Sequence, residues 1–110
     1  MAIVISNILE SNTAIFHDEG LQVYDSIEEG FKRGDQVVLS FVGIKHCSTQ
    51  FLNACIGKLY LTYSKSYIET SLIIEGADNK MLMASIKKVI ENALNAEKYN
   101  QILDEVLAEV

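Results

Sequence analysis

The sequence contains no proline, no low-complexity segment, no internal repeat and no stretch with the composition of a linker. A chain of 110 residues with these properties is predicted to fold as a single domain spanning residues 1–110. At this length, folding buries roughly two thirds of the surface that the unfolded chain exposes, so neither a disulfide nor a structural metal is needed for stability. Apolar residues make up 49% of the composition and charged residues 22%, values typical of globular proteins rather than disordered chains.

The sequence also lacks any concentration of positive charge. Nine lysine and arginine residues face fifteen aspartate and glutamate residues, the net charge is −6, and the basic residues are scattered along the chain. A nucleic-acid-binding surface needs a stripe or cluster of basic side chains to neutralise phosphates, and an anionic membrane surface attracts proteins in the same way. We therefore expect neither a nucleic-acid partner nor a membrane partner.

Long apolar runs and paired cysteines are absent as well. No stretch approaches the roughly 18 continuous apolar residues of a membrane span, and the first residues lack the basic segment and apolar core of a signal peptide. On one helix, Cys47 and Cys55 would be about 12 Å apart along the axis, whereas a disulfide requires Cα atoms within about 7 Å. The two cysteines are predicted to be free thiols in a reducing compartment, which indicates a soluble, cytoplasmic protein.

Hydrophobic periodicity divides the chain into alternating strands and helices. The predicted elements are a strand over 2–9, a short strand over 13–16, a helix over 19–33 ended by Gly34, a buried strand over 37–41, a helix opening at Ser48, a strand over 67–75, a helix following Asp78, and a last segment over 98–110. The resulting order, β-β-α-β-α-β-α-α, predicts an α/β fold in which a sheet of about four strands is packed against helices.

The last segment, residues 98–110, is predicted to be either an extra C-terminal helix or a bent continuation of the helix before it. Its apolar residues recur on one helical face, namely at Ile102, Leu103, Val106, Leu107 and Val110. Such a stripe either packs into the core or contacts a second copy of the chain. It is the best candidate in the sequence for a homodimer contact.

Two hydroxyl residues, Ser48 and Thr49, stand between the buried strand and the helix that follows it. In one interpretation Ser48 is an N-cap, whose hydroxyl accepts a backbone hydrogen bond worth about 1 kcal/mol. In the other, the turn is a binding surface, because the loop after a strand of an α/β sheet lies where binding residues collect. A helix N-terminus also tolerates the negative charge that phosphorylation would add. The residues alone leave both interpretations open.

Other candidates for chemistry are weak. The only imidazoles are His17 and His46, and no Cys-x-x-Cys or His-x-x-x-His spacing is present, so no metal site is expected. No phosphate-binding glycine loop occurs, and the paired carboxylates are best explained as solvated surface. We therefore expect no catalytic residues and no cofactor.

An alternative function is that of a small-ligand-binding protein or an enzyme with a pocket at the same strand ends. Tyr60, Tyr63 and Tyr67 are the side chains that we expect to line such a pocket. A cysteine nucleophile would require one of the histidines to approach Cys47 or Cys55 in space.

The stretch VVLSFVGIKHCSTQFLNACIGKLY resembles the signature of a STAS-like domain family of unknown function, related to the bacterial anti-sigma factor antagonists. Gly43-Ile44 matches the glycine-hydrophobic pair after the strand. Residues 48–53 match the turn and helix start, and Gly57-Lys58-Leu59 matches a later triplet. The flanking segments are similar too, so the resemblance covers roughly residues 15–95.

The resemblance implies a STAS-like fold with a mixed sheet and a non-enzymatic regulatory role. The implied partner is a protein, in particular an ATPase of the histidine-kinase type, which would bind the strand-helix turn at residues 46–53 and phosphorylate a hydroxyl there. Counted from Gly43, Thr49 falls at the position of the phosphorylated serine of the antagonists. The residues that the resemblance assigns to this site are Ser48, Thr49, Gln50, Phe51 and Asn53.

Overall fold

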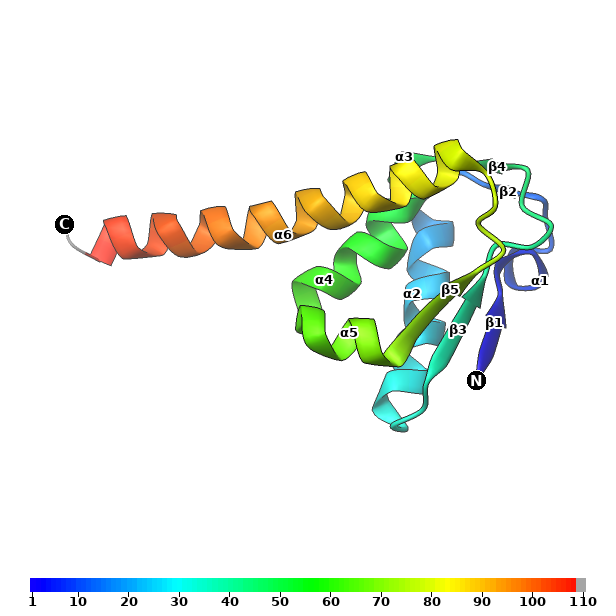
Figure 1. Cartoon of the computed structure of the whole chain (residues 1–110), viewed down its shortest axis with the longest axis horizontal. Helices are drawn as coiled ribbons and strands as arrows, with labels where there is room; N and C mark the ends of the chain where they lie inside the picture. The colour runs from blue at the N-terminus through cyan, green and yellow to red at the C-terminus, as the bar shows by residue number, and fades with distance from the viewer. Residues whose placement is uncertain (109–110) are drawn as a thin grey trace.

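A computed structural model of the chain describes the backbone of residues 1–108 and the side chains of residues 1–96 (Figure 1). Its elements are β1 (Ala2–Val4), α1 (Ile5–Leu9), β2 (Thr13–Ala14), α2 (His17–Lys32), β3 (Val37–Ser40), β4 (His46–Cys47), α3 (Thr49–Leu52), the π-helix η1 (Asn53–Gly57), α4 (Lys58–Thr62), α5 (Lys65–Ser71), β5 (Leu72–Glu75) and α6 (Lys80–Ala108). Since α3, η1 and α4 follow one another without a break, we call them together the 49–62 helix.

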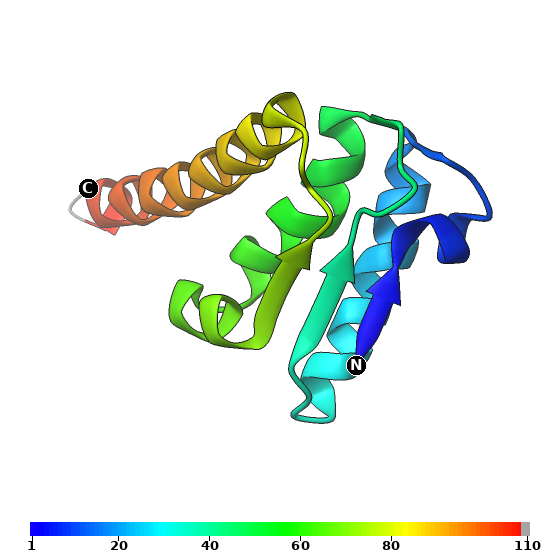
Figure 2. The same cartoon turned by 45° about the vertical axis from the view of Figure 1, so that its right-hand side comes forward.

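The main sheet contains three parallel strands in the order β1-β3-β5, with β3 in the centre (Figure 2). In its register Leu39 lies between Ile3 and Ile74. The short strands β2 and β4 form a separate parallel pair. The described residues therefore hold an α/β fold with parallel strands in sheets of three and two, rather than the single mixed sheet of about four strands expected from the sequence.

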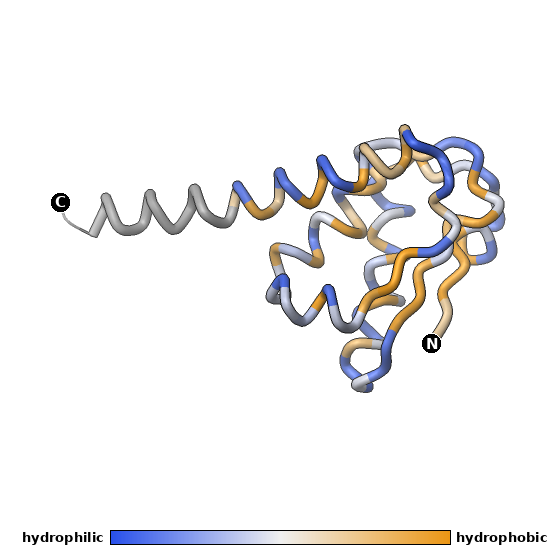
Figure 3. Tube along the Cα trace, viewed as in Figure 1, coloured by the Kyte–Doolittle hydropathy of each residue, from blue (hydrophilic) through white to orange (hydrophobic). Residues whose placement is uncertain are grey.

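Helices cover one face of the main sheet, where α2 packs against β1 and β3 and the 49–62 helix packs on α2. The inward side chains of the strands, such as Ile3 and Leu39, are buried between these layers. Figure 3 shows the strands as mostly hydrophobic segments of the chain. The face turned away from the helices carries the exposed residues Ala2 and Ile73, the latter 45% exposed.

Two predicted strands are shorter than expected because a helical turn replaces part of each. The 2–9 segment becomes helical at Ile5, since Ile5, Ile8 and Leu9 have the spacing of one helical face and pack on the core together. The 67–75 segment begins as helix α5, because the Ser64 hydroxyl accepts a hydrogen bond from the backbone N–H of Tyr67 at 3.2 Å and caps it.

The sequence predicts a helix directly after Asp78, and in the structure Asn79, one residue later, caps helix α6. The side-chain oxygen of Asn79 accepts a hydrogen bond from the backbone N–H of Met81 at 2.8 Å. From Lys80 the backbone is helical to Ala108, so residues 98–108 belong to the same helix. The side chains of the apolar stripe over 102–110, which the sequence suggests as a dimer contact, lie outside the described residues.

Helix α2 lies very close to the 49–62 helix at Gly20. A Cβ atom at this position would lie 2.5 Å from the Cβ of Ala54 and 2.6 Å from the carbonyl oxygen of Phe51, both on the 49–62 helix. These distances are shorter than any van der Waals contact, so only glycine permits this approach. The glycine in the middle of the 49–62 helix is less restricted, because a Cβ on Gly57 would lie 3.3 Å from the nearest atom, a methyl group of Val89.

We predict that Gly20→Ala destabilises the protein by about 1–3 kcal/mol, the usual cost of overpacking, although alanine favours a helix by about 1 kcal/mol. The matched control is Gly57→Ala, whose nearest neighbour is a single methyl group at 3.3 Å and whose effect should be close to zero. Urea unfolding followed by circular dichroism measures both. Equal effects of the two substitutions would contradict the importance of the contact at Gly20.

Candidate functional site

Ser48 fixes the turn between β4 and the 49–62 helix. Its hydroxyl accepts a hydrogen bond from the backbone N–H of Phe51 at 3.0 Å and donates one to the carbonyl oxygen of Ile15. Its own backbone N–H donates to the carbonyl oxygen of Ala14 at 2.9 Å. The N-cap interpretation is thus confirmed, and the cap also ties the turn to the segment between β2 and α2.

The other predicted site residues divide between surface and core. Thr49 and Gln50 are exposed at the start of the helix, and Asn53 is exposed one turn further along. Phe51 is instead completely buried, with 0% of its surface accessible, in the core formed with α2. A protein docking on this turn would touch Thr49 and Gln50 without touching the ring of Phe51, which corrects the expectation that Phe51 faces a partner.

Two large apolar side chains that sequence reasoning missed are exposed near this turn. Phe16 is 67% exposed and follows Ile15, the residue whose carbonyl binds Ser48. Met81 is 78% exposed at the start of α6. The exposed residues Thr49 and Gln50 begin α3, which packs against both α2 and α6, and Phe16 and Met81 stand at the starts of those two helices. We call Phe16, Thr49, Gln50 and Met81 the corner surface.

The sequence context of Phe16 and Met81 does not readily indicate that these two side chains are exposed. Phe16 ends an apolar stretch that suggests a strand, and only the helix start at His17 shows that its side chain leaves the strand pattern. There the Glu19 carboxylate accepts a hydrogen bond from the backbone N–H of Phe16 at 3.1 Å. Met81 similarly falls in the first turn of a helix, ahead of the positions that pack on the core.

A half-open cavity of about 440 Å³ lies beside the turn, between the segment leading into β4 and the first turns of α6. Its walls are formed by Ile15, Ile44, Lys45, His46, Cys47, Asn79, Met81, Leu82 and Ser85. The cavity is therefore assembled from three segments far apart in the sequence, and one of them runs directly into Ser48.

The tyrosines expected to line a pocket here lie elsewhere. Tyr63 and Tyr67 each meet the ring of Phe31 edge-to-face, with ring centroids 5.2 Å apart, and they stack on each other at 5.8 Å. Tyr60 is buried in the core. None of the three lines the cavity, because the 49–62 helix carries them away from the strand ends toward the C-terminal half of α2.

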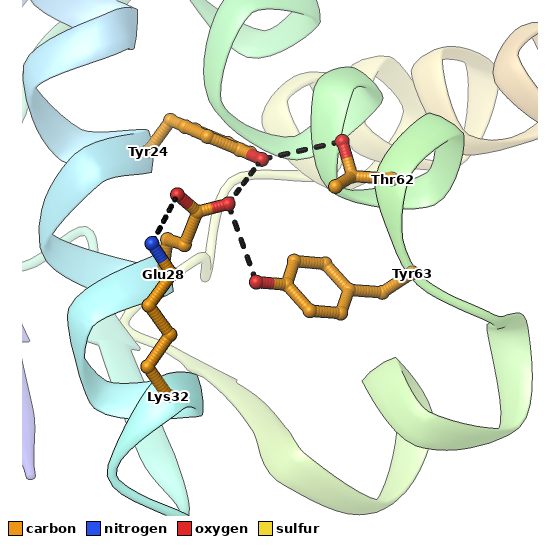
Figure 4. Close-up of polar contacts among 5 residues, drawn as sticks. All are labelled: Tyr24, Glu28, Lys32, Thr62 and Tyr63. Atoms are coloured by element: carbon orange, nitrogen blue, oxygen red, sulfur yellow. Dashed lines mark hydrogen bonds and ion pairs between the residues drawn. The ribbon is translucent and has the colours of Figure 1, made fainter.

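Glu28 is the centre of a polar cluster at that distant end (Figure 4). Its carboxylate accepts hydrogen bonds from the hydroxyls of Tyr24 at 2.7 Å and Tyr63 at 3.2 Å, and it pairs with Lys32 at 3.4 Å. The bond from Tyr24, followed by the interactions with Lys32 and Tyr63, lowers the pKa of Glu28 against the opposing effect of desolvation. The cluster joins α2 to the end of the 49–62 helix.

The tyrosines of this cluster are unsuited to acid-base chemistry. Burial, reinforced by the neighbouring carboxylate of Glu28, raises the pKa of Tyr63, and burial likewise raises the pKa of Tyr24. A catalytic tyrosine would need its pKa shifted toward neutrality instead. We therefore interpret the Glu28 cluster as a structural tie.

The two cysteines are free thiols, and neither is activated. Burial raises the pKa of Cys47 to about 11, and burial also raises the pKa of Cys55. Because the thiolate is the reactive form, both residues are protonated and weakly nucleophilic near neutral pH. This argues against the alternative of a cysteine enzyme at the turn.

Over the part of the chain with described side chains, no three histidine, cysteine, aspartate or glutamate residues are grouped so that they could hold a metal ion. Among the described residues, none of the helices combines the length and the apolar character that a membrane crossing requires.

Comparison with protein families identifies the region that contains the turn. Residues 19–81 match the model of a family described as STAS-like domain of unknown function (DUF4325), and this match covers more than half of the chain. The chain belongs to this STAS-like family. No curated protein and no solved structure matches it. The resemblance inferred from the residues around the turn is thus confirmed.

The STAS-like match includes both β3 and β5, the turn and the whole 49–62 helix, and it ends at Met81 in the first turn of α6. Most of the corner surface therefore lies within the STAS-like region, and Phe16 lies three residues before it. Nearly all of α6 follows the matched region. Two of the residues that α6 contributes to the cavity wall, Leu82 and Ser85, therefore lie outside the match.

We predict that Ser48→Ala lowers the free energy of unfolding by about 1–2 kcal/mol, because the helix loses its N-cap and the carbonyl of Ile15 loses its donor. The control is Thr49→Ala at the neighbouring exposed hydroxyl, which should change stability by less than about 0.5 kcal/mol. Chemical denaturation of both variants tests this. A cost at Thr49 equal to that at Ser48 would show that the cap is assigned to the wrong hydroxyl.

We predict that the stability contributed by Glu28 depends on pH. Because its pKa is lowered in the folded protein, the contribution is present above the ordinary glutamate pKa of about 4.3 and is lost as the pH falls through the folded value. Glu28→Gln should therefore have a lower melting temperature than the unmodified protein at pH 7, and the gap should narrow toward pH 3. The control Glu29→Gln, at an exposed pair with Arg33, should show a small gap at every pH.

Proposed function

We propose that this STAS-like domain is a non-enzymatic regulatory module that binds a protein partner through its corner surface. The observation that carries the proposal is the exposure of Phe16 and Met81 at the starts of the two helices against which α3 packs, together with the exposure of Thr49 and Gln50 on α3 itself. Phenylalanine and methionine are enriched in protein interfaces, and apolar anchors surrounded by polar groups are typical of binding hot spots.

The rigidity of the turn supports the same function. Ser48 forms hydrogen bonds on both sides of the turn, and Phe51 is anchored in the core directly behind it. A surface that is already ordered loses little conformational entropy when a partner docks. The neutral thiols and the raised tyrosine pKa values supply no reactive group that would favour an enzyme instead.

We further propose that phosphorylation of Thr49 regulates docking. The Thr49 side chain is exposed at the first position of the 49–62 helix, whereas the Ser48 hydroxyl is engaged by Ile15 and Phe51. A phosphate on Thr49 would be tolerated by the helix N-terminus and would add nearly two negative charges to the corner surface. The similarity to anti-sigma factor antagonists suggests an ATPase of the histidine-kinase type as both partner and kinase.

Mass spectrometry tests the phosphorylation. After incubation of the protein with ATP and an extract of its native cells, we expect a phosphate on Thr49 in the peptide that contains residues 46–53. Thr49→Ala should abolish this signal without creating a new one at Ser48. A phosphate on Ser48 in the unmodified protein, or an unmodified peptide, would contradict the proposal.

Site-specific photocrosslinking tests the docking surface. A photoreactive amino acid at Gln50 should form adducts with one protein in native cells, whereas the same amino acid at Glu69, exposed on α5 away from the corner surface, should not. The adduct should contain an ATPase, and its yield should fall in Thr49→Glu. Equal adducts from both positions, or none from Gln50, would rule out the corner surface as the docking site.

A further inference from the structure

The cavity beside the turn has the size and the partly apolar lining of a small-molecule site. Of the nine described residues that line it, four have large apolar side chains: Ile15, Ile44, Met81 and Leu82. Its volume of about 440 Å³ falls in the lower part of the range for small-molecule sites, about 300–1,000 Å³. The size suits a compound built around a single ring and is small for a dinucleotide.

The charged side chain at the cavity favours a negatively charged ligand. Among the described residues that line the cavity, Lys45 is the only charged one, and none is an aspartate or glutamate. The ion pairs found among the described side chains all involve other basic residues, namely Lys32, Arg33 and Lys65. In a protein of net charge −6, a cavity with a lysine and no acidic residue is locally suited to an anion.

Three neutral side chains that can form hydrogen bonds also line the cavity. His46 adjoins Lys45 in the chain, and Asn79 and Ser85 face the cavity from the start of α6. These groups can orient a planar or tetrahedral anionic group, while the apolar residues cover the rest of a ligand. The cavity thus combines one charged contact, several neutral polar contacts and an apolar wall.

We propose that this cavity binds a small organic anion, in which one carboxylate or phosphate group is attached to an apolar body the size of one ring. Lys45 pairs with the anionic group, His46 and Ser85 provide hydrogen bonds, and Ile15, Ile44 and Leu82 contact the apolar body. This site goes beyond the proposed partner docking and does not depend on it.

Binding at this site is non-covalent. Cys47 lies in the cavity wall, but burial holds its pKa at about 11, so the thiol is protonated and does not attack a ligand. A reversible ligand here would contact the segment that runs into Ser48 and would adjoin the corner surface, because Met81 lines the cavity and also belongs to that surface.

Titration with defined probes tests the proposal. Phenylacetate and phenyl phosphate carry an anionic group on a ring, 2-phenylethanol is a neutral compound of similar shape, and acetate and inorganic phosphate are anionic groups without the ring. In ¹H–¹⁵N spectra we expect the two ring anions to cause saturable shifts of the amides of residues 44–47 and 79–85. The neutral compound and the isolated anions should bind at least about tenfold more weakly.

Three variants locate the contacts. Lys45→Met keeps the length of the side chain and should weaken phenylacetate binding by about tenfold, the effect of losing one charge-assisted contact. Lys87→Met removes an equivalent charge from the exposed side of α6, outside the cavity, and should leave binding unchanged. Ser85→Phe fills the cavity from a helix surface and should abolish binding while the dispersion of the spectrum shows an intact fold.

Three results would overturn the proposal. These are the absence of saturable shifts with both ring anions up to about 10 mM, a limit for weak binding, equal binding of 2-phenylethanol, and unchanged binding in Lys45→Met. The outcome is independent of the docking experiments, because the crosslinking at Gln50 and the phosphorylation of Thr49 are measured without a probe in the cavity.

Discussion

The close approach of α2 and the 49–62 helix at Gly20 is the contact on which the arrangement of the molecule depends. With no side chain at Gly20, the backbone of the 49–62 helix comes near enough for Phe51 to be fully buried. Burying one such side chain is worth about 1.5–3 kcal/mol. The same approach brings the start of the helix to the segment before α2, where Ser48 reaches the carbonyl of Ile15. Packing between two helices therefore positions the turn.

A turn held in this way offers a rigid surface and a cavity within a short distance of each other. The segment 44–47 lines the cavity and continues through the cap at Ser48 to Thr49 and Gln50 of the corner surface, and Met81 belongs to both sites. The proposed ligand and the proposed partner would therefore be neighbours. The two proposals together would give this STAS-like domain two means of regulation, occupancy of the cavity and phosphorylation of Thr49.

The pH-sensitive cluster of the protein is located away from this region. Glu28 and its tyrosine partners connect the C-terminal half of α2 to the end of the 49–62 helix, whereas Thr49 lies at the start of that helix (Figures 1 and 4). Protonation of Glu28 would loosen the far end of the helix pair while the cap at Ser48 keeps its own hydrogen bonds. Effects of acid on stability and effects of phosphorylation on docking should therefore be separable.

The features that the sequence determined by itself are those with short-range causes. The left-handed Gly34 after α2, with φ of +79°, and the buried strand at 37–40 depend on residues within a few positions of one another. The STAS-like family could also be inferred from the sequence, from a pattern that extends over more than half of the chain. The N-cap at Ser48 is one of two interpretations that the sequence leaves open, and the structure selects it. Only the tertiary structure decided that Phe51 is buried, that the tyrosines leave the strand ends, and that residues 15, 44–47 and 79–85 enclose one cavity. The reason is that hydrogen bonds of caps and turns form between near neighbours, whereas burial and cavities depend on contacts between distant segments, which local periodicity does not specify.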